Sequence, residues 1–141
     1  MAQALEFMQN HMLLIGGFMA VLFMIIKMEV DNNLSGVSQL NSSDAVRLMN
    51  NDKTLVVDTR EASEFSAGHI KGALNIPMSE FKKRLSELEK HKDNDVLLYC
   101  RSGSRSNSAC KMMRKGGFDS IHNLAGGMMG WSSANLPVTK K

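Results

Sequence analysis

The sequence predicts an α/β domain with a central parallel sheet flanked by helices, preceded by one transmembrane helix. Two observations lead to this fold class. Short apolar runs rich in β-branched residues alternate with helical segments, a pattern typical of parallel sheets covered by helices on both faces. The start of the chain differs, because no Lys or Arg occurs before Lys27 and half of the 12 Met lie at or before Met28. The 141 residues therefore divide into an apolar N-terminal segment and one polar domain.

The N-terminal segment has the length and composition of a membrane-spanning helix. Residues 7–26 carry no acidic or basic side chain except His11. At about 1.5 Å of rise per residue they span roughly 30 Å, the thickness of a bilayer core. They are apolar on every face, whereas a surface helix would show only an apolar stripe. We expect residues 1–28 to be a membrane anchor, with residues 7–26 in contact with lipid.

Two alternatives for this segment fit less well. A cleavable signal peptide has a basic start and a small-residue cleavage site, but here the start carries Glu6 and no A-x-A pattern follows Lys27. A buried core helix is rarely so uniformly apolar. Lys27 flanks only the C-terminal side, so the positive-inside tendency predicts a single-pass protein with its C-terminal domain in the cytoplasm.

A short polar stretch and then the domain follow. Residues 29–36 are rich in turn formers and are expected to be a linker, and residues 37–138 the domain. The predicted strands are 37–40, 54–58, 73–76, 95–99 and 120–124. The predicted helices are one ending at Met49 after an N-cap within 41–44, then 61–66, 79–90, 106–115 and 128–133. In the 79–90 helix, the side chains of Phe81, Leu85 and Leu88 share one face.

Composition excludes several classes of protein. The net charge of +3 is small and scattered, which argues against nucleic-acid binding. Two Cys cannot form a disulfide scaffold. No His pair accompanies them, so neither a zinc site nor any other metal or cofactor is expected. Cys110 lies inside a predicted helix and is expected to pack in the core, with a resolving or auxiliary thiol as the alternative.

Cys100 ends the clearest strand and begins the segment Cys100-Arg-Ser-Gly-Ser-Arg105, which leads into a helix. Ligands of parallel sheets bind at this carboxyl edge. The free N–H groups of the helix start and a loop turning at Gly103 can form an anion nest, and Arg101 and Arg105 add positive charge. A thiol in that field should have a lowered pKa and act as a nucleophile. A lone Cys at a strand end is usually a buried hydrophobe, but such Cys are seldom followed by this polar sequence.

Four blocks of sequence then indicate a family. They are Asp58-Thr-Arg60 with Glu64-Phe65 and Gly68-His-Ile-Lys-Gly-Ala-Leu-Asn-Ile-Pro77; Tyr99-Cys-Arg-Ser-Gly-Ser-Arg-Ser106; Gly116-Gly-Phe118; and Asn123-Leu-Ala-Gly-Gly-Met-Met-Gly-Trp131. In this order and at these spacings they resemble the signatures of the rhodanese-like domain family of sulfurtransferases. The resemblance covers about residues 37–137, nearly all of the polar domain.

The resemblance implies a small α/β fold and a mechanism. Cys100 would accept a sulfane sulfur from a donor such as thiosulfate, becoming a persulfide, and pass it to a thiophilic acceptor such as cyanide or a protein thiol. The amides of Arg101, Ser102, Gly103, Ser104 and Arg105 would hold the sulfur. Arg105 and Arg60 would orient an anionic donor, with an ion pair from Arg60 to Asp58 or Glu64 as the alternative. His69 is expected to fix a turn and Trp131 to lie in the core.

Two rival functions remain at this point. Cysteine-dependent phosphatases place five residues between Cys and Arg, whereas four separate Cys100 from Arg105 here and position 106 is Ser. The tighter ring suits one sulfur atom better than a tetrahedral phosphate. The second rival is a non-catalytic, membrane-tethered interaction module, for which the anchor suggests a membrane-protein partner. Loss of the Cys would favour that module, but Cys100 is present.

Overall fold

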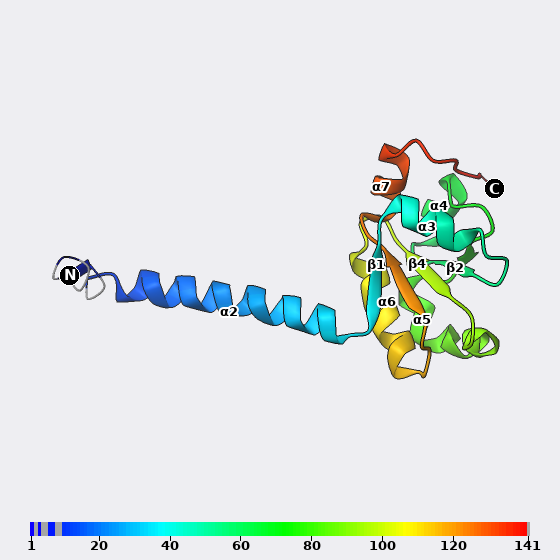
Figure 1. Cartoon of the computed structure of the whole chain (residues 1–141). Coiled ribbons are helices and arrows are strands. Elements are labelled where there is room, and N and C mark those ends of the chain that lie inside the picture. The colour runs from blue at the N-terminus through cyan, green and yellow to red at the C-terminus, as the bar shows by residue number, and fades with distance from the viewer. Residues whose placement is uncertain (2, 4–5, 8–9, 141) are drawn as a thin grey trace. The chain divides into compact units, whose positions relative to one another are not determined.

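The N-terminal part of the chain forms a unit of its own. In a computed structural model, residues 1–140 are described except residues 2, 4, 5, 8 and 9. Contacts divide the chain into one unit up to Ser35 and a second from Gly36 onward. The first unit contains the long helix α2 (Met12–Leu34) (Figure 1). Its residues Met12–Asp31 are long and apolar enough to cross a membrane, and none of that stretch is buried. The predicted contact segment 7–26 includes residues 8 and 9, which lie outside the described residues, as do residues 2, 4 and 5 of the expected anchor.

The second unit is built on a five-stranded sheet. Its strands are β1 (Val37–Leu40), β2 (Leu55–Asp58), β3 (Leu74–Asn75), β4 (Val96–Tyr99) and β5 (Ile121–Leu124). They lie in the order β1-β5-β4-β2-β3, and all of their pairings are parallel. The central strand β4 is buried along its whole length. The predicted α/β class with a central parallel sheet is therefore confirmed.

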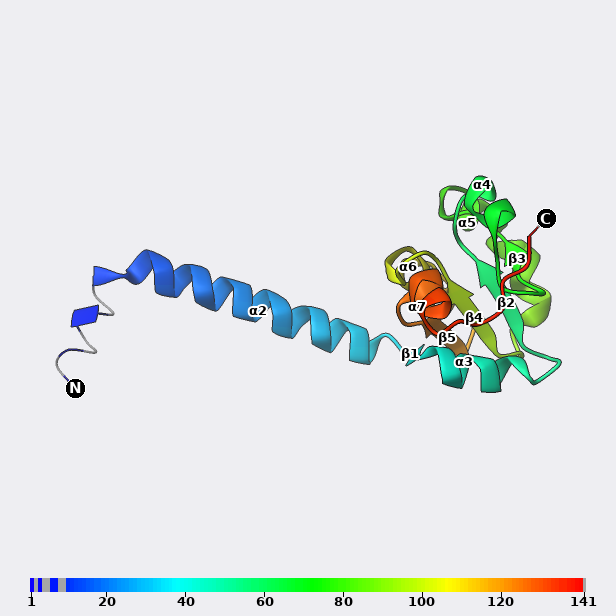
Figure 2. The same ribbon diagram turned by 90° about the horizontal axis from the view of Figure 1, so that it is seen from above.

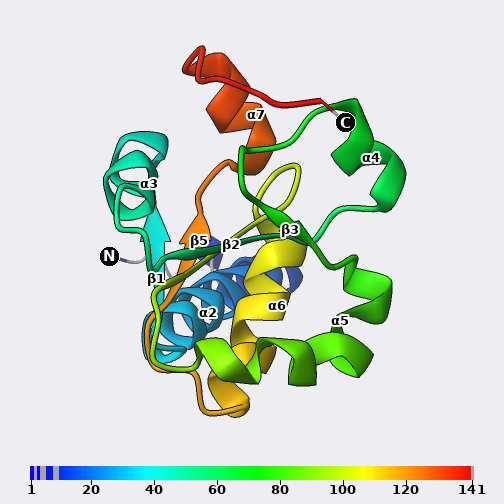
Figure 3. The same ribbon diagram turned by 90° about the vertical axis from the view of Figure 1, so that its right-hand side faces the viewer.

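Helices cover both faces of this sheet. Helices α5 (Met78–Arg84) and α6 (Ser104–Lys115) lie on one side, and α3 (Ser42–Met49) and α7 (Gly127–Ser133) on the other (Figure 3). One core cluster joins Phe81 and Met113 to the first face, and a second joins Ala45 and Trp131 to the other. Each fully buried large apolar side chain of this kind contributes about 1.5–3 kcal/mol. Trp131 therefore lies in the core, as expected.

Two predicted elements differ from the structure. The 79–90 helix is divided: α5 ends at Arg84 and a 3₁₀-helix η1 (Leu85–His91) continues the chain. A 3₁₀ turn superimposes side chains three residues apart, so Leu85 and Leu88 still pack against the same core cluster as Phe81. The segment expected as a linker is largely helical, because α2 continues to Leu34. No Gly or Pro interrupts residues 27–34, so their backbone can extend the helix.

The carboxyl edge of the sheet gathers three connections. Helix α4 (Ala62–Ala67) follows β2, the loop of Cys100 follows β4, and α7 follows β5. The chain after α7 runs across this end of the domain toward β3 (Figure 2). There Thr139 and His69 exchange two backbone hydrogen bonds of 2.8 Å. These connections place the candidate site.

Candidate active site

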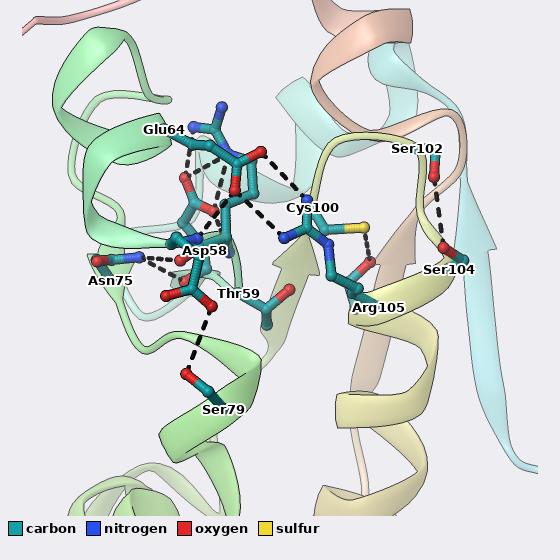
Figure 4. Close-up of polar contacts among 12 residues, drawn as sticks. Asp58, Thr59, Glu64, Asn75, Ser79, Cys100, Ser102, Ser104 and Arg105 are labelled. Atoms are coloured by element: carbon teal, nitrogen blue, oxygen red, sulfur yellow. Dashed lines mark hydrogen bonds and ion pairs between the residues drawn. The ribbon is translucent and has the colours of Figure 1, made fainter.

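The sulfur of Cys100 lies within the loop between β4 and α6. The backbone N–H of Gly103 donates to Cys100 Sγ at 3.0 Å. Gly103 precedes the first turn of α6 and has φ +100°, a conformation that favours glycine. Cys100 is fully buried, while Arg101, Ser102 and Ser104 around it are exposed. Figure 4 shows Cys100 beside Ser102 and Ser104 of this loop. The sulfur therefore lies beneath a single exposed loop, at the positive end of a helix.

The first two carbonyl groups of this segment, those of Cys100 and Arg101, are bonded by α7. Met128 N donates to Cys100 O at 2.9 Å, and Met129 N donates to Arg101 O at 3.1 Å. The approach is close, because a Cβ on Gly127 would lie 2.4 Å from Cys100 O. The first amides of α7 thus hold the oxygens of the loop on its outer side. The amides that follow are then free to turn toward the sulfur, as an anion nest requires.

Two polar side chains extend the surroundings of the sulfur. Ser106 Oγ lies 3.5 Å from Cys100 Sγ and only 2.6 Å from Asn123 Oδ1. Asn123 Nδ2 donates to Gly103 O at 3.1 Å and to Gln39 Oε1 at 2.9 Å. Ser106 and Asn123 are buried. A chain of hydrogen bonds therefore runs from the sulfur to β1.

The two thiols have opposite pKa shifts. Burial acts to raise the pKa of Cys100, but hydrogen bonds from the Ser106 hydroxyl and from the Ser106, Gly103 and Ser102 amides outweigh it. The pKa of Cys100 therefore lies below that of an ordinary thiol. Burial raises the pKa of Cys110 to about 12. Cys110 lies on α6 and packs in the core cluster, as predicted, and of the two thiols only Cys100 has surroundings suited to a thiolate.

Arg60 is held by an ion pair. Its Nη2 lies 2.6 Å from Asp58 Oδ2, and it also donates to Gly68 O at 2.7 Å. The side chains of Arg60 and Asp58 are buried. Of the two partners weighed for Arg60, the structure has Asp58. The guanidinium therefore stabilises the segment after β2. Its charge is compensated by Asp58, so it attracts a bound anion only weakly.

Arg105 is engaged by Glu64 of α4. Nη1 and Nη2 of Arg105 donate to the two carboxylate oxygens at 3.2 and 3.3 Å (Figure 4). The hydrogen bond from Arg105 lowers the pKa of Glu64, so this carboxyl is ionised at neutral pH. The side chain of Arg101, in contrast, makes no hydrogen bond or ion pair within the described part of the chain. Arg101 is thus the arginine of the three whose charge is not compensated.

A cleft of about 520 Å³ lies beside the loop. Arg60, Glu64 and Arg101 form its polar wall. Its remaining lining residues are Ala67, Gly68, Met128, Met129, Ser132 and Val138. No three His, Cys, Asp or Glu side chains among residues 1–140, apart from the five undescribed positions, could hold a metal ion together. Because its lining combines the charged Arg101 with apolar side chains, the cleft can receive a small anionic or amphipathic molecule.

The residues that support the loop from outside are not evident from the sequence. Ser106 and Asn123 are separated by 17 positions, and only their common burial reveals the contact. Gly127 belongs to the sequence block 123–131, but that block does not reveal its close approach to the backbone of Cys100 and Arg101. His69 does fix a turn, since its Nδ1 lies 2.8 Å from Phe65 O and its ring stacks on Phe65.

Fold and site together define a small parallel α/β domain with a cysteine in the loop between its central strand and the following helix. The chain belongs to the rhodanese-like domain family, whose model matches residues 42–134. It is 32% identical over 141 residues to the protein YibN of Escherichia coli K12, covering 99% of both chains. It is 40% identical over 92 residues to a sulfurtransferase of Allochromatium vinosum, covering 65% of this chain and 84% of that one.

Solved structures agree with this assignment. A rhodanese-related protein from Thermoplasma volcanium superimposes with a TM-score of 0.66 at 27% identity. The match covers 74% of this chain and 99% of that one. This likeness supports the parallel α/β fold.

Proposed function

We propose that the chain is a membrane-anchored sulfurtransferase in which the Cys100 thiolate carries sulfane sulfur as a persulfide. The observation that supports this most directly is the position of Cys100 Sγ, 3.0 Å from the Gly103 amide at the start of α6. The carbonyls of Cys100 and Arg101 are bonded by α7, which leaves the amide of Gly103 and the start of α6 to supply positive dipoles at the sulfur. The sulfurtransferase among the relatives supports the same reaction class.

The reaction has two steps. The thiolate attacks the outer sulfur of thiosulfate, the sulfur–sulfur bond of the donor breaks, and sulfite leaves with the bonding electron pair. A thiophilic acceptor, cyanide or a thiolate, then takes the outer sulfur and Cys100 leaves as a thiolate. No net oxidant is consumed. Loop amides of residues 101–105 stabilise the negative outer sulfur between the steps.

The arginines have different roles in this proposal. Arg101, uncompensated and at the cleft, attracts the anionic donor. The charge of Arg105 is partly compensated by its ion pair with Glu64. Arg60 lines the cleft but stays bound to Asp58, so it adds only a secondary positive potential. The ion pair with Glu64 also argues against a phosphatase in which Arg105 substitutes for the arginine missing at position 106, because that guanidinium would have to be available to phosphate.

The N-terminal helix locates the enzyme. We assign residues 1–28 to the anchor, 29–36 to the connection and 37–138 to the catalytic domain. The exposed apolar surface of α2 supports a lipid contact, and Lys27 supports a cytoplasmic domain. A membrane protein that delivers or receives sulfur is the partner this arrangement would favour.

The test is thiocyanate formation by the full-length protein in detergent. With thiosulfate and cyanide, the wild type should form thiocyanate and Cys100→Ser should lose the activity by at least about a thousandfold. The matched control is Cys110→Ser, which removes the other thiol and should keep most of the activity. Thiocyanate formation by Cys100→Ser at the wild-type rate would refute the proposal. A wild type without activity would instead favour a binding module.

A further inference from the structure

The hydroxyl group of Ser106 lies among three acceptors. Its Oγ is 2.6 Å from Asn123 Oδ1, 3.2 Å from Gly103 O and 3.5 Å from Cys100 Sγ. A serine hydroxyl has a single hydrogen, so it can serve only one of these acceptors fully. The shortest of the three distances is to Asn123 Oδ1, so the hydroxyl donates its hydrogen to Asn123 in the arrangement observed.

The amide of Asn123 is fixed in the orientation that makes this contact. Its Nδ2 donates to Gly103 O and to Gln39 Oε1, both of which can only accept. Turning the amide over would place its oxygen against these two oxygens and leave its NH₂ group facing Ser106. Gln39 is itself held by Asn107 at 3.2 Å. Asn123 Oδ1 is therefore aimed at Ser106 by its own hydrogen bonds.

The demand on the Ser106 hydrogen depends on the state of Cys100. A neutral thiol can donate its proton to Ser106 Oγ while the hydroxyl donates to Asn123, and every group is satisfied. A thiolate only accepts, and the hydrogen bond of a donor to a charged sulfur is stronger than one to a neutral oxygen. When the thiol proton has left for solvent, sulfur and Asn123 compete for the same hydrogen.

We propose that the Ser106 hydroxyl is a two-position donor, which bonds Asn123 while Cys100 is protonated and turns to the sulfur when Cys100 is a thiolate. Asn123 is the positioning residue that sets the resting position. The inference rests on the proposed function only in taking Cys100 as the reactive thiol. In a persulfide the negative charge lies on the outer sulfur, so the hydroxyl returns to Asn123. This hydrogen bond stabilises the persulfide form of Cys100 relative to the bare thiolate.

The experiment measures the alkylation of Cys100 by iodoacetamide as a function of pH, with full-length protein in detergent and mass spectrometry of the Cys100 peptide. Asn123→Leu removes the competing acceptor at nearly constant size. The midpoint of the pH profile should fall by roughly half to one pH unit. Ser106→Ala should raise the midpoint by a similar amount. In the Ser106→Ala background, Asn123→Leu should shift nothing, since no hydroxyl remains to be released.

Controls separate this effect from a loosened loop. Gln39→Leu removes one hydrogen bond of Asn123 but leaves the acceptors of Ser106 in place, and should leave the midpoint unchanged. Asn123→Val, which suits a strand, is a second variant, and unreactive Cys110 reports an intact core in the same sample. An unchanged or raised midpoint in both Asn123 variants, or an equal fall without Ser106, would overturn the inference. A wild-type midpoint at the ordinary thiol value would contradict the proposed function instead.

Discussion

At the scale of single residues, the charges near Cys100 are largely paired with one another. Asp58 neutralises Arg60, and Glu64 neutralises Arg105. The thiolate therefore depends on aligned N–H and O–H groups more than on guanidinium charge. Such preorganised donors keep their strength at moderate ionic strength, whereas exposed charges are screened.

The pairing of Arg105 predicts the effect of one substitution. Glu64→Gln removes a negative charge from the wall of the cleft and releases Arg105. Gln retains the oxygen that accepts from Glu61 N and caps α4. The KM for thiosulfate should fall by roughly two- to fivefold, equivalent to at most about 1 kcal/mol, with kcat nearly unchanged. Steady-state thiocyanate formation at varied thiosulfate concentration measures both constants.

The matched control for this prediction is Glu87→Gln. Glu87 is also paired with an arginine, Arg84, and its loss changes the net charge equally. It lies on η1 and not in the cleft, so its KM should remain at the wild-type value. Equal changes in both variants would indicate a general effect of net charge, and a higher KM for Glu64→Gln would mean that Glu64 assists the donor.

The residues of the site differ in how far the sequence could reveal them. Cys100 and its loop are contiguous, so the strand, the glycine turn and the helix start that position them can be read locally. The partner of Arg105 is 41 positions away, and the contact between Ser106 and Asn123 joins two different elements. Such pairings depend on which strands become neighbours, and the spacing of residues along the chain does not encode that.

At the scale of elements, α7 supports the loop of Cys100 from the side opposite to the sulfur. Its first amides bind the carbonyls of Cys100 and Arg101, and this contact requires a residue without a side chain at position 127. Gly127 also has φ +52°, which L-residues rarely adopt. The short helix therefore determines the geometry of the active loop.

Gly127→Ala should damage both stability and activity. The new Cβ would contact backbone atoms of Cys100 and Arg101, which cannot move without displacing the loop. We expect a loss of about 1–3 kcal/mol in the free energy of unfolding and at least a tenfold lower rate of thiocyanate formation. Chemical unfolding and the activity assay measure the two effects on the same sample.

Gly130→Ala in the same helix is the control. The nearest atom to its Cβ would be Ala125 O at 3.5 Å, an ordinary contact. Because Ala favours a helix over Gly by up to about 1 kcal/mol, this variant should be as stable as the wild type or more so. Similar losses in both variants would show that any side chain added at a glycine of α7 is harmful. That result would contradict a specific contact at Gly127.

The order of strands and helices follows from the sequence pattern because each apolar run is long enough to form only one element. Whether a helix is an α-helix or a 3₁₀-helix is harder to predict from the sequence. The same spacing of Phe81, Leu85 and Leu88 suits an α-helix, yet the last two belong to a 3₁₀-helix that reaches the same core. The continuation of α2 through residues 29–34 also does not follow from their composition, because Asn and Asp are weak helix formers that a helix can nevertheless accommodate.

At the scale of the whole molecule, the chain combines an apolar helix with a domain that folds around its own two core clusters. The similarity to the E. coli protein covers 99% of both chains, so the relative has an N-terminal segment of matching length. The A. vinosum sulfurtransferase aligns over only 65% of this chain. The two relatives thus differ in how much of this chain they match.

Arginine in the middle of α2 should release the protein from membranes. Replacing Val21 and Leu22 by Arg places two charges near the centre of the span, each costing roughly 2.5–3.5 kcal/mol in a bilayer. Alkaline carbonate extraction should leave the wild type with the membranes and move the variant to the supernatant. The control, Glu29→Lys with Asp31→Lys, changes charge at the end of the helix and should stay in the membrane fraction. A wild type extracted by carbonate would contradict the anchor.

The central claim is that Cys100 carries the transferred sulfur, and the mass of the Cys100 peptide tests it most directly. Full-length protein is incubated with thiosulfate, freed of excess donor and digested without reductant. The proposal predicts that the Cys100 peptide gains the mass of one sulfur atom, that one sulfite is released per sulfur bound, and that cyanide removes the gain. A Cys100 peptide of unchanged mass, or the added sulfur on Cys110, would contradict it.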